Sequence, residues 1–239
     1  MKNQSGNVLF LILIAVALFA ALSYAVTQSS RGGGGNANEE VFRTEIARID
    51  SFQASMRAAL TRMRVIGSVD PENIDFRAYQ GTTGDVWYRN NALPMRSTNS
   101  NCGDDTCRVF HTNGGGVIPI ILDEAVVGEP FTASNTARLR HGVVDASRVA
   151  GFGSDAHDII VQFFRIQDDF CEAFNEQRGI SGIPADDRGD YIGIGGSFSF
   201  VDNGAFGYGD EATELAGQDS FCVNSVDEGN TIVLVLLER

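Results

Sequence analysis

The sequence predicts an α+β fold: a long N-terminal helix, with a membrane or filament half and an exported amphipathic half, packed on an antiparallel β-sheet with Gly-rich loops. Three observations support this class. Residues 8–26 form an uncharged apolar run. Residues 38–65 then repeat apolar residues with helical spacing. The later apolar segments are short and separated by turns rather than by long helices, which is typical of antiparallel sheets.

The first apolar run has the length of a bilayer span. As a helix, residues 8–26 would extend about 28 Å at about 1.5 Å per residue, close to the ~30 Å hydrocarbon core of a membrane. We therefore predict a transmembrane helix over residues 7–30, with membrane lipid as a partner. The glycine cluster in residues 31–37 predicts a hinge, because glycine is costly within a helix.

An exported α+β domain is predicted over residues 38–239. Its first element is an amphipathic helix over residues 38–65, which Asn38 caps and which Gly67 and Pro71 end. One face of this helix carries the apolar stripe Phe42, Ile46, Ile49, Met56, Leu60 and Met63.

Strands follow from apolar segments bounded by turn residues. We predict a hairpin from strands 107–111 and 117–122 around the glycine turn 112–116. Further strands are predicted over 138–144, 158–166, 197–201 and 230–237, with 158–166 central in the sheet. A short helix is predicted over 170–178, with Asp168 and Asp169 as its cap and Gly179 as its end.

Four cysteines follow the apolar run and favour disulfides formed in an oxidising compartment. Their spacing suggests the pairs Cys102–Cys107 and Cys171–Cys222, the second closing a loop worth about 4 kcal/mol. Zinc is the alternative, but no C-x2-C motif occurs, and Cys107 with His111 gives C-x3-H without a second half. We therefore predict no metal site.

Composition narrows the classes of partner. The formal net charge of −13 argues against nucleic acid and against anionic lipid surfaces, both of which attract Lys and Arg. No nucleic-acid partner is therefore predicted. Paired aspartates could hold calcium, although none matches an EF-hand loop. These pairs are Asp104–Asp105, Asp168–Asp169 and Asp186–Asp187.

Residues 151–158 are the strongest candidate for catalysis, because Ser154, Asp155, His157 and Asp158 lie close together in the sequence. Members of a Ser-His-Asp triad usually come from distant segments, and the G-x-S-x-G elbow is missing. A Gly-rich turn before the next strand explains the segment more simply. No motif surrounds any of the three histidines, His111, His141 and His157. We predict no catalytic residues and no cofactor.

The N-terminus resembles a type IV prepilin or pseudopilin. The resemblance rests on a short polar leader ending in Gly6, an apolar helix that starts at once, and a second helix after it. It implies a leader over residues 1–6, cleavage between Gly6 and Asn7 by a prepilin peptidase, and methylation of the new N-terminus. It also implies that the helix over residues 7–30 is a filament-core helix, packed against other pilin-like subunits. Asn7 stands where the family usually has Phe. Leu11 stands where it usually has Glu, which favours a minor or tip-located subunit.

The resemblance thus implies a structural subunit of a bacterial type IV pilus or related secretion apparatus. Its expected location is the bacterial inner membrane with a periplasmic or cell-surface domain, or an extracellular filament. Two alternatives stay open. One is an uncleaved inner-membrane anchor that carries a periplasmic enzyme or ligand-binding domain. The other is a secretory signal peptide cleaved after Ala25.

Overall fold

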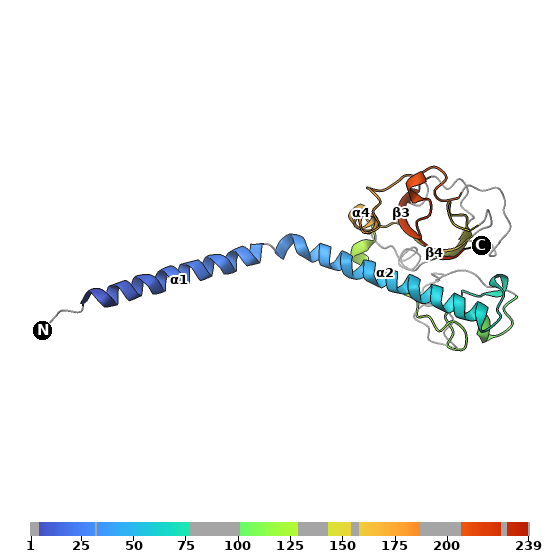
Figure 1. Cartoon of the computed structure of the whole chain (residues 1–239), viewed down its shortest axis with the longest axis horizontal. Helices are drawn as coiled ribbons and strands as arrows, with labels where there is room; N and C mark the ends of the chain where they lie inside the picture. The colour runs from blue at the N-terminus through green and yellow to red at the C-terminus, as the bar shows by residue number, and fades with distance from the viewer. Residues whose placement is uncertain are drawn as a thin grey trace. The chain divides into compact units, whose positions relative to one another are not determined.

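The computed structural model describes residues 5–31, 33–76, 101–128, 143–153, 158–186, 207–225 and 229–238 (Figure 1). The chain divides into two compact units, Met1–Arg43 and Thr44–Arg239. Its first two helices are α1 (Ser5–Arg31) and α2 (Gly33–Val65), and a shorter helix, α4 (Asp168–Glu176), follows later in the chain. The chain is α+β, and its sheet lies in the second unit.

The predicted membrane half of one long N-terminal helix is wrong. Within the described residues, we find no helix that combines the length and apolarity needed to cross a bilayer. A helix that spans a bilayer needs about 20 consecutive, predominantly apolar residues. The predictions of a transmembrane helix over residues 7–30 and of an inner-membrane location are corrected accordingly.

The predicted amphipathic helix over residues 38–65 is confirmed as part of α2, but α2 begins earlier than expected. Gly33, Gly34 and Gly35 lie within the helix, so Asn38 is not its N-cap. Glycine lowers helix propensity by about 1 kcal/mol relative to alanine without forbidding the helical backbone. The predicted hinge over residues 31–37 is therefore too wide.

Four strands form one antiparallel sheet in the order β1-β2-β4-β3. They are β1 (Val143–Ser147), β2 (Asp158–Phe163), β3 (Ser220–Ser225) and β4 (Gly229–Leu237). β2 and β4 occupy the centre, and Val161 pairs with Leu234 between them. Every residue of β2 is buried, as expected for a strand covered on both faces.

Helix α2 covers one face of the sheet from within the second unit. Its buried residues recur every three or four positions, so they form one stripe along the helix. The ring of Phe52 packs edge-on against Phe163 of β2, with 6.5 Å between the ring centroids. Each buried large apolar side chain contributes about 1.5–3 kcal/mol. The stripe consists of Ile46, Ile49, Phe52, Gln53, Met56, Ala59, Leu60 and Met63.

The opposite face of the sheet packs against chain segments outside the regular elements. Side chains of β2, β3 and β4 alternate between the two faces, as the period of two residues requires. Tyr208 lies edge-on to Phe221 of β3, with 5.7 Å between the ring centroids. The cluster on this face consists of Val149, Ile160, Ile180, Tyr208, Ala212, Leu215, Phe221, Val223, Val233 and Val235.

The predicted hairpin over residues 107–122 is wrong. A hydrogen bond from the Val117 N–H to the Val109 carbonyl joins its two halves, but no ladder forms. A Cβ atom on Gly114 would lie 2.1 Å from the Arg108 carbonyl oxygen, and one on Gly115 would lie 2.2 Å from that of Val109. The glycines therefore let the backbone coil closely on itself instead of running as two strands.

The other predicted strands and the predicted short helix agree with the structure to different extents. The strands predicted over 158–166 and 230–237 are confirmed as β2 and β4, and the helix over 170–178 as α4. Of the strand predicted over 138–144, Val143 and Val144 lie in β1, and residues 138–142 lie outside the described residues. The strand over 197–201 lies outside the described residues. β3 was not predicted, because its sequence is short and polar at both ends.

Candidate functional site

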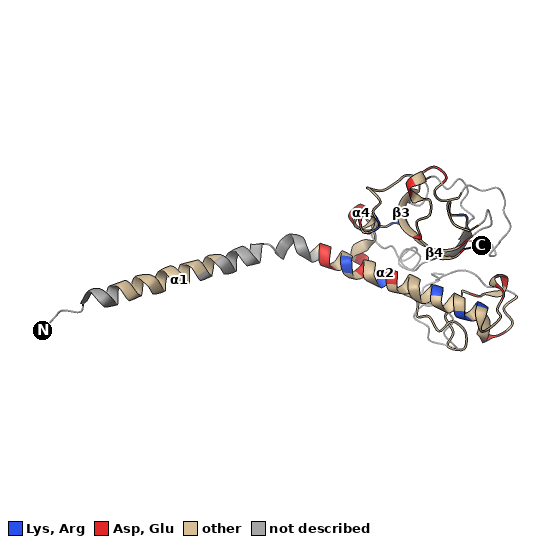
Figure 2. Cartoon of the chain, viewed as in Figure 1, with Lys and Arg blue, Asp and Glu red and all other residues tan. Residues whose placement is uncertain are grey.

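Helix α1 exposes large apolar side chains around its whole circumference. Successive residues of an α-helix point about 100° apart, so four in a row face all sides. Phe10, Leu11, Ile12 and Leu13 are each 58–61% exposed. From Phe10 to Tyr24, α1 also carries no charged residue (Figure 2). Further exposed apolar residues on this helix are Ile14, Val16, Leu18, Phe19 and Tyr24.

An apolar surface of this kind is typical of a helix that binds a partner. A helix that is apolar on every side is normally enclosed on every side, and large exposed apolar patches mark interaction sites. Leu11 is part of this surface. We take α1 as the candidate functional site. The predicted processing residues, Gly6 and Asn7, lie in its first turn.

The prediction of disulfide bonds is confirmed, with Cys102 joined to Cys107 and Cys171 joined to Cys222. The second bond connects α4 to β3, and both of its cysteines are fully buried. Disulfides form and persist in oxidising environments, which favours an exported protein.

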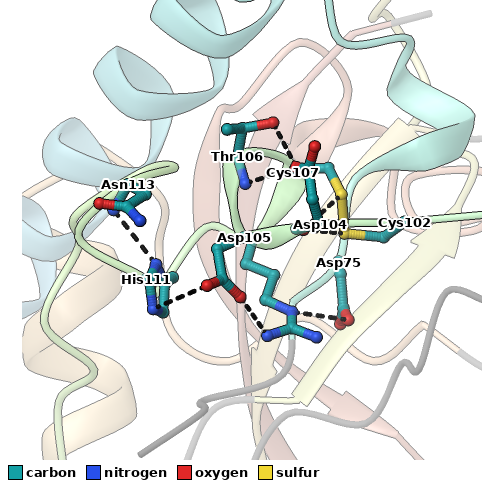
Figure 3. A network of polar contacts seen from close by, with 9 residues as sticks. Asp75, Cys102, Asp104, Asp105, Thr106, Cys107, His111 and Asn113 are labelled. Atoms are coloured by element: carbon teal, nitrogen blue, oxygen red, sulfur yellow. Dashed lines mark hydrogen bonds and ion pairs between the residues drawn. A yellow bond between two sulfur atoms is a disulfide. The ribbon is translucent and has the colours of Figure 1, made fainter.

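A polar cluster lies beside the Cys102–Cys107 bond (Figure 3). Arg108 pairs with the Asp105 carboxylate, and its Nε lies 3.9 Å from the buried carboxylate of Asp75. The His111 Nε2 lies 3.5 Å from an Asp105 oxygen, and its Nδ1 accepts a 3.2 Å hydrogen bond from the Asn113 backbone N–H. Because both ring nitrogens of His111 have partners, this cluster joins segments of chain rather than offering a free base.

Asp104 secures the turn between these two cysteines. Its carboxylate accepts hydrogen bonds from the Thr106 hydroxyl and from the Thr106 backbone N–H. These bonds favour the ionised form and lower the pKa of Asp104 below its ordinary value. The predicted aspartate pair Asp104–Asp105 therefore has a structural role in capping this turn.

Most of the other residues considered for catalysis lie outside the described residues. These are His141, Ser154, Asp155 and His157. Asp158 is fully buried and accepts a 3.1 Å hydrogen bond from the Val149 N–H, which ties the start of β2 to the preceding loop. Among the described residues, no group of three His, Cys, Asp or Glu side chains is arranged to hold a metal ion.

The second predicted aspartate pair also has a structural partner. The prediction that Asp168 and Asp169 cap α4 is wrong, because the N-cap is Gln167 and the helix begins two residues earlier than expected. Both aspartates lie in its first turn, where acidic side chains complement the helix dipole. The Asn230 side chain donates a 2.7 Å hydrogen bond to Asp168. The start of α4 is thereby tied to β4.

The carboxylate of Asp186 is buried. The sequence suggested only that Asp186 and Asp187 could together hold calcium. Its Oδ2 accepts hydrogen bonds from the backbone N–H groups of Gly209 and Ala212, at 2.8 Å and 3.2 Å. Its Oδ1 is buried without a hydrogen-bond partner in the described structure. Burial raises the pKa of Asp186, the two N–H bonds oppose the shift, and the charges of Glu211 and Asp210 add to it.

A groove of about 490 Å³ runs between α2 and the segment 115–120. Arg48 and Arg62 line it, but both cations already bind backbone carbonyls. Arg48 donates to the Ile121 oxygen and Arg62 to the Gly114 oxygen, each at 3.2 Å. These arginines hold the segment against α2. Comparisons with protein-family models, curated proteins and solved structures give no match for the chain.

Proposed function

We propose that the chain is an exported structural subunit, pilin-like in kind, whose α1 helix packs against the α1 helices of other subunits. The observation that carries this proposal is the exposure of apolar side chains around the whole of α1. The two disulfides support a role outside the reducing cytosol. As expected from Leu11, we propose a minor or tip-located subunit of a type IV pilus or related secretion apparatus.

The free energy gained by burying apolar side chains favours packing of α1 against several neighbouring helices rather than against one. Burying a Leu, Ile or Phe side chain contributes about 1.5–3 kcal/mol, and association costs about 4–15 kcal/mol before any contact is made. A few side chains on one face of α1 could offset that cost in a dimer. A dimer would leave the other faces in water, whereas a bundle of helices covers them all.

We also propose that a prepilin peptidase cuts between Gly6 and Asn7. The cut removes Lys2, the only charged residue before Arg31. The helix that remains has no charged side chain up to Ser30, so its one charge in this stretch is the new terminal amine. Intact-mass measurement of the native protein should give a chain that begins at Asn7 with a methylated amine. A chain that begins at Met1, or after Ala25, contradicts this processing.

Assembly is tested with the full chain and a charge placed in α1. The wild-type chain, transferred from mild detergent to buffer, should sediment as large assemblies, and the Leu13→Arg chain should stay monomeric. Ile118, which is 82% exposed in the second unit, provides the matched control. The Ile118→Arg chain should assemble like the wild type. A monomeric wild type, or assembly that survives Leu13→Arg, contradicts the proposed function.

A further inference from the structure

The turn that ends α2 is closed by backbone hydrogen bonds. The N–H groups of Ile66 and Gly67 both donate to the Arg62 carbonyl, at 2.9 Å and 3.3 Å. The N–H of Val69 donates to the Met63 carbonyl at 3.0 Å. These bonds satisfy carbonyls that a helix end otherwise leaves unpaired. The path of the chain after α2 is therefore fixed.

Two residues show how tightly this turn is held. A Cβ atom on Gly67 would lie 2.7 Å from the Met63 carbonyl oxygen, so a side chain does not fit there. Ser68 has a left-handed backbone, with φ of 52°. Such a conformation is unfavourable for a residue other than glycine and persists where its surroundings impose it.

The fixed turn holds two large apolar side chains in water. Val65 is 75% exposed and Ile66 is 78% exposed, and the exposed cation of Arg64 stands next to them. A hollow of about 490 Å³ adjoins Val65. We name this surface the tip turn; it consists of Ile66 and of the residues that line the hollow, which are Thr61, Arg64, Val65, Ser68, Val69, Asp70 and Pro71. A rigid surface of this kind binds a partner with little loss of conformational freedom.

The chain itself carries a segment of complementary chemistry. Residues 38–41 begin the described side chains of α2 and contain Glu39, Glu40 and Val41. The Glu39 side chain is 57% exposed, and Val41 is 39% exposed. Glu39 pairs with Arg43 at 2.6 Å, but an exposed pair of this kind contributes about 0.3–0.5 kcal/mol and exchanges easily.

The charges of α2 are segregated along its sequence. Before residue 51, α2 carries four acidic residues together with Arg43 and Arg48, whereas residues 51–65 contain Arg57, Arg62 and Arg64 and no acidic residue (Figure 2). In a chain of net charge −13, residues 51–65 stand out as a basic stretch; within the tip turn itself, Asp70 accompanies Arg64.

We propose that the tip turn of one subunit binds residues 38–41 of a second copy. Arg64 faces Glu39 and Glu40, while Val65 and Ile66 cover Val41. This proposal rests on the proposed function, since it names one contact within that assembly. The two surfaces differ from each other, so the contact is head-to-tail and can repeat along a filament.

Charge reversal with mixing tests this contact on the full chain. The R64E chain alone and the E39R/E40R chain alone should each need at least tenfold more protein to assemble in sedimentation experiments. An equimolar mixture of the two should recover the wild-type behaviour, because each reversed surface then meets its opposite. The E176R/E214R chain, changed equally in charge at exposed sites elsewhere, should assemble like the wild type.

An apolar variant tests the contact independently of charge. V65S/I66S should weaken assembly at least tenfold, and I118S should leave it unchanged. The inference is overturned if the wild type assembles and the reversed chains, or V65S/I66S, assemble equally well, or if mixing brings no recovery. That result leaves the proposed function standing. A wild-type chain that stays monomeric overturns both.

Discussion

The side chain of Asn175 bonds the backbone of Cys222 in both directions. Its Oδ1 accepts from the Cys222 N–H, and its Nδ2 donates to the Cys222 carbonyl, each at 2.7 Å. A neighbouring strand would bond β3 in the same way, so the amide of Asn175 substitutes for one. Cys171, one helical turn earlier, forms its disulfide with the same Cys222. Helix α4 thus covers the edge of β3 at Cys222, and the segment 184–186 pairs with Asn224 further along the same edge, where an open edge would invite pairing with another chain.

We expect Asn175→Ala to lower the free energy of unfolding by about 2–5 kcal/mol. The change leaves the buried N–H and C=O of Cys222 without partners, and each such group costs about 1–3 kcal/mol. Urea unfolding of the oxidised protein measures the loss. Asn113→Ala, at an exposed site, should change stability by less than about 0.5 kcal/mol. Equal stabilities of the two variants would contradict the role of Asn175.

Gln53 gives a second test of buried hydrogen bonds, here between α2 and the sheet. Its Nε2 donates to the carbonyls of Asp219 and Val235, at 2.8 Å and 3.1 Å. Gln53→Leu keeps the buried volume but removes these donors, so we expect a loss of about 1–3 kcal/mol in urea unfolding. Ser55→Ala, on the exposed face of α2, should be close to neutral. A Gln53→Leu protein as stable as the wild type argues against this link.

The sequence predicts best what depends on local pattern. Helix α2 was predicted from a long apolar stripe, and β2 and β4 from apolar runs that need no partner to be recognised. β3 gains its structure from pairing with β4 and from Asn175, which lies 47 positions before Cys222. The sequence of residues 107–122 predicts a hairpin, because the close approach of Gly114 and Gly115 to the backbone is visible only in the structure.

The candidate site was predicted in part. The composition of α1 shows its apolarity, but a pattern alone does not tell a membrane span from a helix that other helices enclose. Asp186 had no usable signal, because its partners Gly209 and Ala212 stand 23 and 26 positions later. The tip turn was equally hidden, since Val65 and Ile66 look like core residues until their exposure is seen.

The two disulfides should differ in their response to reductant. Cys171 and Cys222 are fully buried, whereas Cys102 is partly exposed, and a thiolate must reach a sulfur atom to exchange. We expect dithiothreitol under native conditions to reduce Cys102–Cys107 first, as thiol alkylation with peptide mass spectrometry would show. Simultaneous reduction of both bonds would contradict this order.

Removal of each disulfide should also lower the free energy of unfolding by a different amount. Cys102–Cys107 has a sequence separation of 5 and Cys171–Cys222 one of 51. In the chain-entropy model, these loops correspond to about 2 and about 4 kcal/mol. Replacing each pair by alanines and comparing urea midpoints measures the difference. A larger loss for the short loop would show that the bond acts on the folded state.

Asp186 should make the protein less stable as the pH rises from about 4 towards neutral. Burial raises the pKa of Asp186 in the folded protein, while the unfolded chain keeps the ordinary value of about 3.9. Above that value the folded protein binds more protons than the unfolded chain, so the free energy of unfolding falls with rising pH until the folded pKa is passed.

Asp186→Asn removes this dependence, because the amide oxygen still accepts from Gly209 and Ala212 but carries no proton to lose. Its stability relative to the wild type should therefore rise between pH 4 and pH 7 in thermal unfolding. Asp186→Ala separates the two effects, since it loses the hydrogen bonds at every pH and should be destabilised throughout. If Asp186→Asn and the wild type differ by the same amount at both pH values, the buried carboxylate does not titrate in this range.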